Sequence, residues 1–382
     1  MSEESVTQVT DEKASIGLWE RWDRIKTTER FPIVVAIGFV SLWSWFFARS
    51  PIISDVLRGY HSLATTILVW SIFAIGFNLL LHQTGYLSFG HAMFWGVGSY
   101  AAALLAIHVY GDPLLMLSVG TGVAVLLAAI TGLIALRLHT VYFSIVTLAM
   151  AQILYYLSLS PLDGLTGGDD GLTGVPVEPL FFGVGNFYLQ TPLPGVFHTL
   201  WQDYQYLLIA VVFVAVVAFV NRVRRSPYGL IFKAIRENER RAALVGVDVW
   251  RYKFAAYLMS GAITGLAGAL LTIESQSSLL SSLYWLTSGE VVVMAILGGA
   301  GSVFGPVIGA GVFLYFDRVF DGIAWAPPLI GDITGPVGQY WLLILTALFT
   351  VVVAWSPQGI VGLLKQLAGT VRSKLEAATR DR

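Results

Sequence analysis

The chain has 382 residues, of which 56% are hydrophobic and 12% are charged, and its mean hydropathy is +0.71. A soluble domain carries about twice that charged fraction, so the composition excludes an ordinary soluble protein. The formal net charge is -1 and no basic surface dominates, which argues against nucleic acid as a partner. The absence of cysteine excludes disulfides, thiolate metal sites and cysteine nucleophiles.

Apolar runs recur from Phe31 to Ala354, and each is long enough to cross a hydrocarbon core of roughly 30 Å as a helix. Backbone groups in lipid need internal hydrogen bonds, and these runs lack the alternation of barrel strands. The sequence therefore predicts an all-α, polytopic membrane protein with about ten spans. The predicted spans are Phe31–Ala48, Ser62–Leu81, Gly85–Val109, Pro113–Leu136, Val141–Ser160, Tyr204–Val220, Tyr252–Ile273, Leu283–Ala300, Val303–Phe320 and Gln339–Ala354.

The eighth and ninth spans are short and meet in a glycine-rich run, "GGAGSVFGP". Glycine has no side chain, so it lets neighbouring helices approach closely, and it also destabilises a helix. This run is therefore compatible with two structures. The two segments are either separate spans or one broken or re-entrant hairpin.

The distribution of Lys and Arg predicts the orientation of the chain, because short loops that carry positive charge stay in the cytoplasm. Residues 222–253 hold nine Lys and Arg, whereas residues 161–203 hold none and are acidic. We expect a permease domain over 31–360 in the cytoplasmic (inner) membrane, with 161–203 outside and 222–253 inside. The tails, 1–30 and 361–382, are expected in the cytoplasm.

The stretch "RSPYGLIFKAIRENERRAALVGVDVWRYK" predicts one amphipathic helix of roughly five turns between Pro227 and Gly246. Ser226 is predicted to cap its start with a side-chain oxygen, and Asp248 to cap the helix that follows. Glu237 is expected to pair with Lys233 and Arg241 at helical spacing. The predicted apolar face consists of Ile231, Ile235, Ala242 and Val245.

Two interpretations of this charged helix remain open. Its cations cost about 2.5–3.5 kcal/mol each in lipid, so it lies in the cytoplasm or on the inner surface. It either fixes topology and touches anionic headgroups, or it docks into a groove on a partner protein. The mixed charge and the capped ends favour docking, because a topology signal needs positive charge alone.

Four blocks of sequence resemble the permease subunits of branched-chain amino acid ABC importers, of the LivM type, over about residues 62–364. They are "TGYLSFGHAMFWGVGSYAAALLA" (Thr84–Ala106), "LTGGDDGLTGVP" (Leu165–Pro176), the charged helix with "KAIRENE", and "LGGAGSVFGPVIGA" (Leu297–Ala310) followed by "SPQGIVGLL" (Ser356–Leu364).

The resemblance implies that the charged helix is a coupling helix, which seats in a cleft of an ATP-hydrolysing subunit. It implies two such subunits with ATP and Mg²⁺, a homologous second permease subunit, an extracytoplasmic binding protein and a small amino acid substrate. No cofactor is expected on this chain. The sequence departs from the importer pattern E-A-A-x-x-x-G, because Arg240 and Arg241 precede Ala242. The coupling residues implied are Lys233, Arg236, Glu237, Asn238, Glu239, Arg240, Arg241 and Gly246.

A substrate pathway is predicted where glycines break membrane helices, since exposed backbone groups and helix ends hold charged substrates there. The alternative for these positions is close helix packing, with His91 bonded to a neighbouring carbonyl. Intramembrane carboxylates are functional candidates, and Glu290 is preferred over Glu274, which is expected at headgroup level. The candidates are Ser88, Gly90, His91, Glu290, Ser302 and Gly305.

The run "GYLSFGHA" is not a nucleotide site, because His91 and Ala92 stand where a Walker A loop has lysine and a hydroxyl. The sequence predicts neither catalytic residues nor a metal site. Transport of urea or short amides is the alternative within the family. An ion-coupled secondary carrier, and after it a membrane enzyme, are the alternatives outside it.

Overall fold

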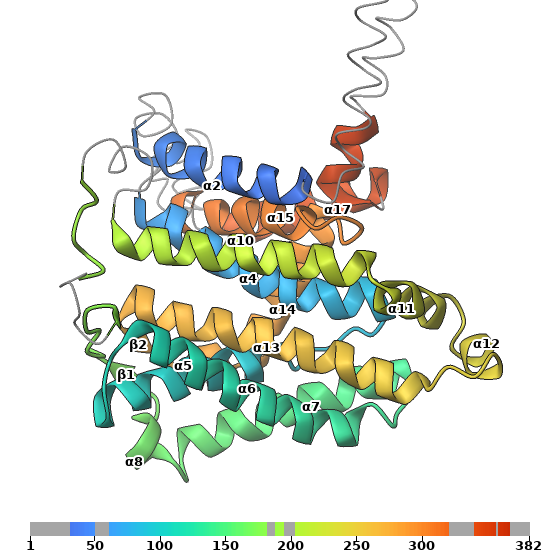
Figure 1. Ribbon diagram of the computed structural model, residues 1–382, viewed down its shortest axis with the longest axis horizontal. Coiled ribbons are helices and arrows are strands. Elements are labelled where there is room, and N and C mark those ends of the chain that lie inside the picture. Colours follow the sequence, from blue (N-terminus) through green and yellow to red (C-terminus); the bar gives the residue numbers. More distant parts are fainter. Residues whose placement is uncertain are drawn as a thin grey trace, which may run out of the picture.

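The computed structural model of the chain describes residues 31–49, 61–181, 188–194, 203–320, 340–356 and 358–366, and most of these are helical (Figure 1). The predicted cytoplasmic tails lie outside the described residues, apart from 361–366, as do two segments of the predicted external loop, 182–187 and 195–202.

The elements follow the chain in this order: α2 (Phe31–Arg49), α4 (His61–Thr84), α5 (His91–His108), α6 (Pro113–Ala135), α7 (Thr140–Leu159), α8 (Asp163–Thr166), β1 (Leu172–Thr173), α10 (Tyr204–Arg225), α11 (Pro227–Glu237), α12 (Glu239–Leu244), α13 (Val249–Ser275), β2 (Ser277–Ser278), the 3-10 turn η2 (Leu280–Leu283), α14 (Trp285–Gly298), α15 (Gly305–Tyr315), the π-helical turn η3 (Phe316–Phe320) and α17 (Trp341–Trp355).

Five helices among the described residues are long and apolar enough to cross a membrane, or six if the bent pair Trp341–Trp355 and Gly359–Gln366 counts as one span. About ten spans therefore stays a prediction. Helix α14 has 14 residues and α15 has 11, so α14 is about 21 Å long and falls short of a bilayer core of roughly 30 Å. Because α14 and α15 also pack against each other, a broken or re-entrant hairpin suits them better than two spans.

Helix α13 is central to the bundle and packs against α4, α5 and α6 (Figure 1). Backbone-to-backbone approach makes this packing possible. A Cβ on Gly98 of α5 would clash with the carbonyl of Gly265 on α13, and one on Gly268 would clash with the carbonyl of Trp95. Small residues are the usual means of bringing membrane helices into van der Waals contact, since lipid provides no hydrophobic drive for helix association.

The two ends of the bundle carry different structures (Figure 1). Helices α11 and α12 project from one end, which we call the α11 end. At the opposite end, the β2 end, β1 pairs with β2 in antiparallel register, Leu172 opposite Ser278 and Thr173 opposite Ser277. Helix α13 runs from α12 to β2 and so connects the two ends.

The predicted third span, Gly85–Val109, begins too early. Its helix α5 starts at His91, and residues 85–90 form a non-helical segment. Gly85 adopts φ +78°, a left-handed conformation that ends α4 and that glycine adopts without strain. The glycines of "TGYLSFGH" thus separate two helices.

The prediction of one continuous charged helix is wrong, because the segment forms α11 and α12 with a break at Asn238. Asn238 is extended (φ −160°, ψ 102°), and its Oδ1 accepts a hydrogen bond from the backbone N–H of Arg241 at 3.0 Å. Asparagine competes with the helix by bonding nearby backbone groups, so it caps α12 rather than continuing α11.

Of the two predicted helix caps, one is confirmed and one is wrong. Asp248 caps α13 by accepting from the N–H of Arg251 at 3.3 Å, as expected. The Ser226 hydroxyl does not cap α11, because it donates to the Val223 carbonyl at 2.7 Å and so satisfies the end of α10. Pro227 takes the first helical position as predicted.

Two glycines of α6 provide a matched test of the close packing. A Cβ on Gly120 would lie 2.7 Å from the Gly98 carbonyl oxygen, whereas one on Gly122 meets no atom within 4 Å. We expect Gly120→Val to destabilise the purified chain by about 1–3 kcal/mol through overpacking. Gly122→Val should leave the unfolding temperature in detergent near that of the wild type. Equal unfolding temperatures for the two variants would contradict this packing.

Candidate functional site

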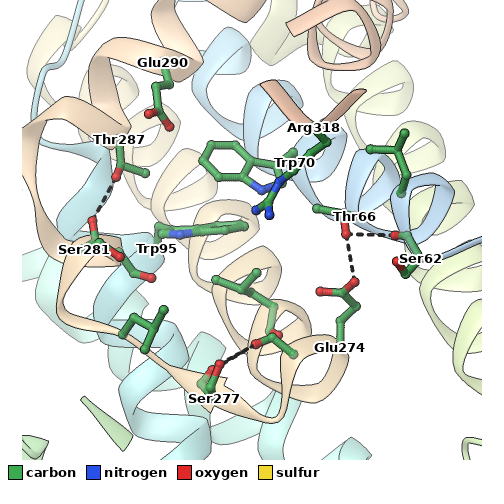
Figure 2. Close-up of a pocket in the computed structure, with 15 residues that line it drawn as sticks. Ser62, Thr66, Trp70, Trp95, Glu274, Ser277, Ser281, Thr287, Glu290 and Arg318 are labelled. Atoms are coloured by element: carbon green, nitrogen blue, oxygen red, sulfur yellow. Dashed lines mark hydrogen bonds between the residues drawn. The ribbon is translucent and has the colours of Figure 1, made fainter. Parts of the chain in front are cut away.

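A cavity of about 460 Å³ lies at the β2 end, where α4, α5, α13, α14 and η3 meet (Figure 2). Its wall combines two carboxylates, one guanidinium, hydroxyl groups and two indole rings. The lining residues are Ser62, Leu63, Thr66, Trp70, Trp95, Leu271, Glu274, Ser275, Ser277, Leu279, Ser281, Ser282, Thr287, Glu290 and Arg318.

Glu274, near the end of α13, is held on one side of the cavity by a hydroxyl from α4. The Thr66 hydroxyl oxygen lies 2.8 Å from Glu274 Oε1 and 2.9 Å from the Ser62 carbonyl oxygen, so it donates to one of them at a time. The side chain of Glu274 is half-buried, and its expected position at headgroup level stays a prediction.

Glu290 on α14 lies on another side of the cavity, and its carboxylate is directed into it (Figure 2). Within the described residues, the carboxylate has no hydrogen-bond or ion-pair partner. Arg318, on η3, also reaches the cavity. Its Nε lies 3.2 Å from Asp317 Oδ2, and its two terminal nitrogens point inward (Figure 2).

Two indole rings form the apolar part of the wall. The ring centroids of Trp70 and Trp95 are 5.1 Å apart, and the ring planes meet at 45°. The ring of Phe73 stacks on that of Trp95, with a centroid distance of 4.6 Å. Trp70 lies in the middle part of α4, and Trp95 lies one turn into α5, where it is buried. These rings are therefore part of the interior of the protein.

The predicted pathway residues of the first glycine block lie elsewhere. Ser88, Gly90 and His91 are buried and do not line the cavity, which α5 reaches one turn later at Trp95. The Nε2 of His91 is 2.7 Å from the Ser260 hydroxyl, which donates to the Gly76 carbonyl at 2.7 Å. This geometry fits the packing alternative, with a hydroxyl between the imidazole and the carbonyl.

Gly90 and the second glycine block show the same close approach of backbones. A Cβ on Gly90 would clash with the carbonyl of Thr147, and one on Gly305 with the carbonyl of Gly299. The Ser302 hydroxyl oxygen accepts a hydrogen bond from the Gly305 N–H at 2.7 Å, which orders the turn between α14 and α15. Of the six predicted pathway residues, Glu290 is the one that lines the cavity.

Sequence reasoning missed Trp70, Trp95 and Arg318. The position of the tryptophans in the middle of apolar runs was a usable signal. Arg318 had only a weak signal, because it falls at the end of a predicted span, where a charged residue looks like a solvated terminus.

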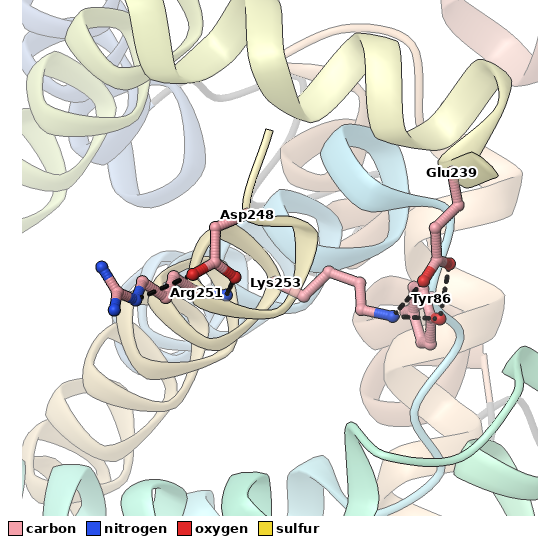
Figure 3. Close-up of polar contacts among 5 residues, drawn as sticks. All are labelled: Tyr86, Glu239, Asp248, Arg251 and Lys253. Carbon is pink, nitrogen blue, oxygen red and sulfur yellow. Dashed lines mark hydrogen bonds and ion pairs between the residues drawn. The ribbon is translucent and has the colours of Figure 1, made fainter. Parts of the chain in front are cut away.

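At the α11 end, a triad of polar side chains joins α12 to α13 and to the segment that precedes α5 (Figure 3). Lys253 Nζ lies 2.8 Å from Glu239 Oε1 and donates to the Tyr86 hydroxyl at 2.7 Å. The Tyr86 hydroxyl in turn donates to Glu239 Oε2 at 3.2 Å. Because the Lys253 side chain is only 6% exposed, the ammonium depends on these two partners for solvation.

The other predicted coupling residues divide into two groups. Arg236 donates to the His82 carbonyl at 2.7 Å and so ties α11 to the end of α4, and Asn238 caps α12. The remainder are exposed, and the predicted pairs of Glu237 are not among the ion pairs that the structure gives for the described residues. The exposed residues are Lys233, Glu237, Arg240, Arg241 and Gly246, of which Gly246 adopts φ +88° after the end of α12.

The end of α12 exposes apolar side chains that the predicted face did not foresee. Ile235 and Ala242 are buried as expected, and Ile231 is half-buried, but Val245 is 80% exposed and the adjacent Leu244 is 86% exposed. The break at Asn238 reorients α12 relative to α11, so one helical face no longer runs through both. An exposed apolar pair thereby follows exposed Arg240 and Arg241 at the end of α12.

The comparisons with known proteins agree with one another. The family model described as "Branched-chain amino acid transport system / permease component" matches residues 59–354. The high-affinity branched-chain amino acid transport permease LivM of Escherichia coli is 29% identical, over 81% of this chain and 72% of its own length, and that of Salmonella typhimurium matches equally well. A ribose import permease of Bacillus subtilis is 30% identical, but over 43% of this chain and 47% of its own.

No solved structure matches the chain. The family model covers most of the chain, including all the elements from α4 to α15 that form the cavity and the triad. The chain therefore belongs to the family of permease components of branched-chain amino acid transport systems, whose members are membrane proteins that cross the bilayer several times.

Proposed function

We propose that this chain is the membrane-spanning subunit of an ATP-driven importer that moves branched-chain or similar small amino acids inward. Separate ATP-binding subunits supply the energy, a homologous second permease subunit completes the pathway, and an extracytoplasmic protein delivers the substrate. The observation that carries the proposal is the α11–α12 segment, which combines a surface suited to docking with fixed connections to the bundle, in a chain of this family.

The exposed surface of α12 suits a protein groove. Leu244 and Val245 would otherwise remain in water, and burying an apolar side chain of this size contributes roughly 1.5–3 kcal/mol. Exposed Arg240 and Arg241 lie on the same short helix and give the contact an electrostatic component. An ATP-binding subunit is the occupant we propose, with its own ATP and Mg²⁺; the chain itself contributes no chemistry.

The connections of this segment give docking a mechanical effect. The triad joins α12 to α13, and Arg236 joins α11 to the end of α4. Since α13 packs closely against α4, α5 and α6, a displacement of α12 is carried into the bundle rather than absorbed by a loop. ATP binding and hydrolysis in the partner would in this way bias the permease between two states.

The relatives bear on the substrate. The two LivM proteins, matched over 81% of this chain, are named for branched-chain amino acid transport, and the ribose permease match covers 43%. We therefore propose an amino acid over a sugar, and over the urea or short amides considered above. Uphill uptake by the purified chain alone, driven by a proton or sodium gradient, would refute the ATP-driven mechanism and support an ion-coupled carrier.

The triad can be tested against a neighbouring glutamate. Glu239→Gln removes the charge that faces Lys253. We expect this to lower the free energy of opening of α12 by about 1 kcal/mol, which increases the opened population roughly fivefold. Tryptic cleavage after Arg240 and Arg241, followed by mass spectrometry, reports that opening. Glu237→Gln alters an exposed side chain on the other side of the break and should change the rate little. Equal cleavage rates for the two variants would exclude a fastening role for the triad.

Docking can be tested at the tip of α12. Leu244→Asp should abolish copurification of the ATP-binding subunits with the permease, because a carboxylate would enter an apolar contact. Leu244→Met, which keeps an apolar side chain of similar volume, should retain them. Both variants should elute from size-exclusion chromatography as the wild-type chain does. Normal copurification of the aspartate variant would exclude this surface as the docking site.

The orientation can be tested because the chain has no native cysteine. A membrane-impermeant maleimide should label Ser281→Cys, at the β2 end, in intact cells. It should label Arg251→Cys, an exposed position at the start of α13 near the α11 end, only after the cells are lysed. The reverse pattern would place the docking segment outside and would refute the proposed function.

A further inference from the structure

We propose that the cavity at the β2 end binds a free zwitterionic amino acid with an apolar side chain. Glu290 would hold the ammonium group, Arg318 the carboxylate, and the rings of Trp70 and Trp95 the side chain. The inference rests on the proposed function for the class of substrate. It adds a substrate-binding site within the permease chain itself. The volume, about 460 Å³, lies within the usual range of small-ligand pockets, roughly 300–1,000 Å³.

The ammonium position follows from the difference between the two glutamates. Glu274 already accepts from the Thr66 hydroxyl at 2.8 Å. Glu290 is half-buried, directs its carboxylate into the cavity, and has no partner among the described residues (Figure 2). A half-buried carboxylate without a protein partner is poorly solvated, and a charged ligand group compensates for this best. Glu290 is therefore the stronger ammonium acceptor.

The carboxylate position follows from the free end of Arg318. Its Nε faces Asp317, which leaves both terminal nitrogens directed into the cavity (Figure 2). A guanidinium presents parallel N–H donors that match the two oxygens of a carboxylate. The same guanidinium disfavours a bare metal cation in this cavity, although two glutamates line it.

The apolar position lies between the two glutamates. In Figure 2 the two indole rings occupy the centre of the wall, with Glu290 on one side and Glu274 on the other. Leu63 and Leu271 extend this apolar surface. A ligand that has opposite charges at one end and a branched hydrocarbon at the other satisfies Glu290, Arg318 and the rings together, whereas a sugar or urea has no charge for either group.

The experiment uses the cysteine-free full-length chain in nanodiscs, with one cysteine introduced at the cavity as Ser281→Cys. Leucine at saturating concentration should slow maleimide modification of this cysteine by about tenfold, as expected when a bound ligand covers the position. A cysteine at Ser118, which is exposed on α6 and does not line the cavity, should be modified at the same rate with and without leucine.

Two analogues test the two charged contacts. 4-Methylpentanoate lacks the ammonium group and isoamylamine lacks the carboxylate, so each should need at least about tenfold higher concentration than leucine to protect the cysteine, the equivalent of one charged hydrogen bond. Equal protection by all three compounds would overturn recognition at both ends.

Substitutions identify the contacts. Glu290→Gln should remove the preference for leucine over 4-methylpentanoate, and Arg318→Gln the preference for leucine over isoamylamine. Glu274→Gln should retain both preferences. The two variants report on different groups, so a folding defect in one leaves the other as a test. Unchanged preferences in a folded Glu290→Gln or Arg318→Gln chain would overturn the assigned contacts.

Failure of this inference is distinguishable from failure of the proposed function. Leucine uptake by the complete transporter, with no protection of the cysteine at position 281, would overturn the binding site alone. Lack of uptake together with lack of bound ATP-binding subunits would overturn the proposed function.

Discussion

The close approach of backbones between α13 and its neighbours is the constraint on which the rest of the structure depends. A Cβ on Gly98, Gly120 or Gly268 would clash with a backbone carbonyl oxygen of a neighbouring helix, and a Cβ on Gly265 would clash with the Cβ of Ala124. Helices packed in this way have few alternative positions, because an added atom meets backbone or an alanine Cβ rather than a movable side chain. The interior of the bundle is therefore stiff. The two ends of the bundle carry different polar residues, the triad at the α11 end and the cavity at the β2 end.

Helix α13 contributes a charged residue to each end of the bundle. Its first turn carries Lys253, which holds α12 through Glu239 and Tyr86, and its last turn carries Glu274, which lines the cavity. A 27-residue helix spans about 40 Å, so one element links the α11–α12 segment with the cavity at the β2 end. In the proposed importer, this arrangement would let ATP binding in a partner subunit act on the cavity through α13.

The sequence predicted the helical class, the family and most helices within a few residues, because long apolar runs have one stable conformation in lipid. It could not predict the break at Asn238, because the local pattern of charges and apolar residues suits a continuous helix. The hydrogen bond from the Arg241 N–H to the Asn238 side chain starts a new helix instead, and the contact of Glu239 with Lys253 holds that helix in place. It identified Glu290 from its position in a span. It did not find Arg318, Trp70 or Trp95, because the cavity is formed by segments that are distant in the chain, and no local pattern records their meeting.

The two-residue pairing of β1 with β2 has a consequence for substrate delivery. It joins the segment after α8 to the residues that follow α13, and Ser277 of β2 belongs to the cavity wall. In the proposed importer, a carrier protein resting on the 161–203 loop would therefore contact a segment that is hydrogen-bonded to the residues after α13. By thermodynamic reciprocity, nucleotide binding that repositions α13 would change the affinity for the carrier, and the bound carrier would change the affinity for nucleotide by the same factor.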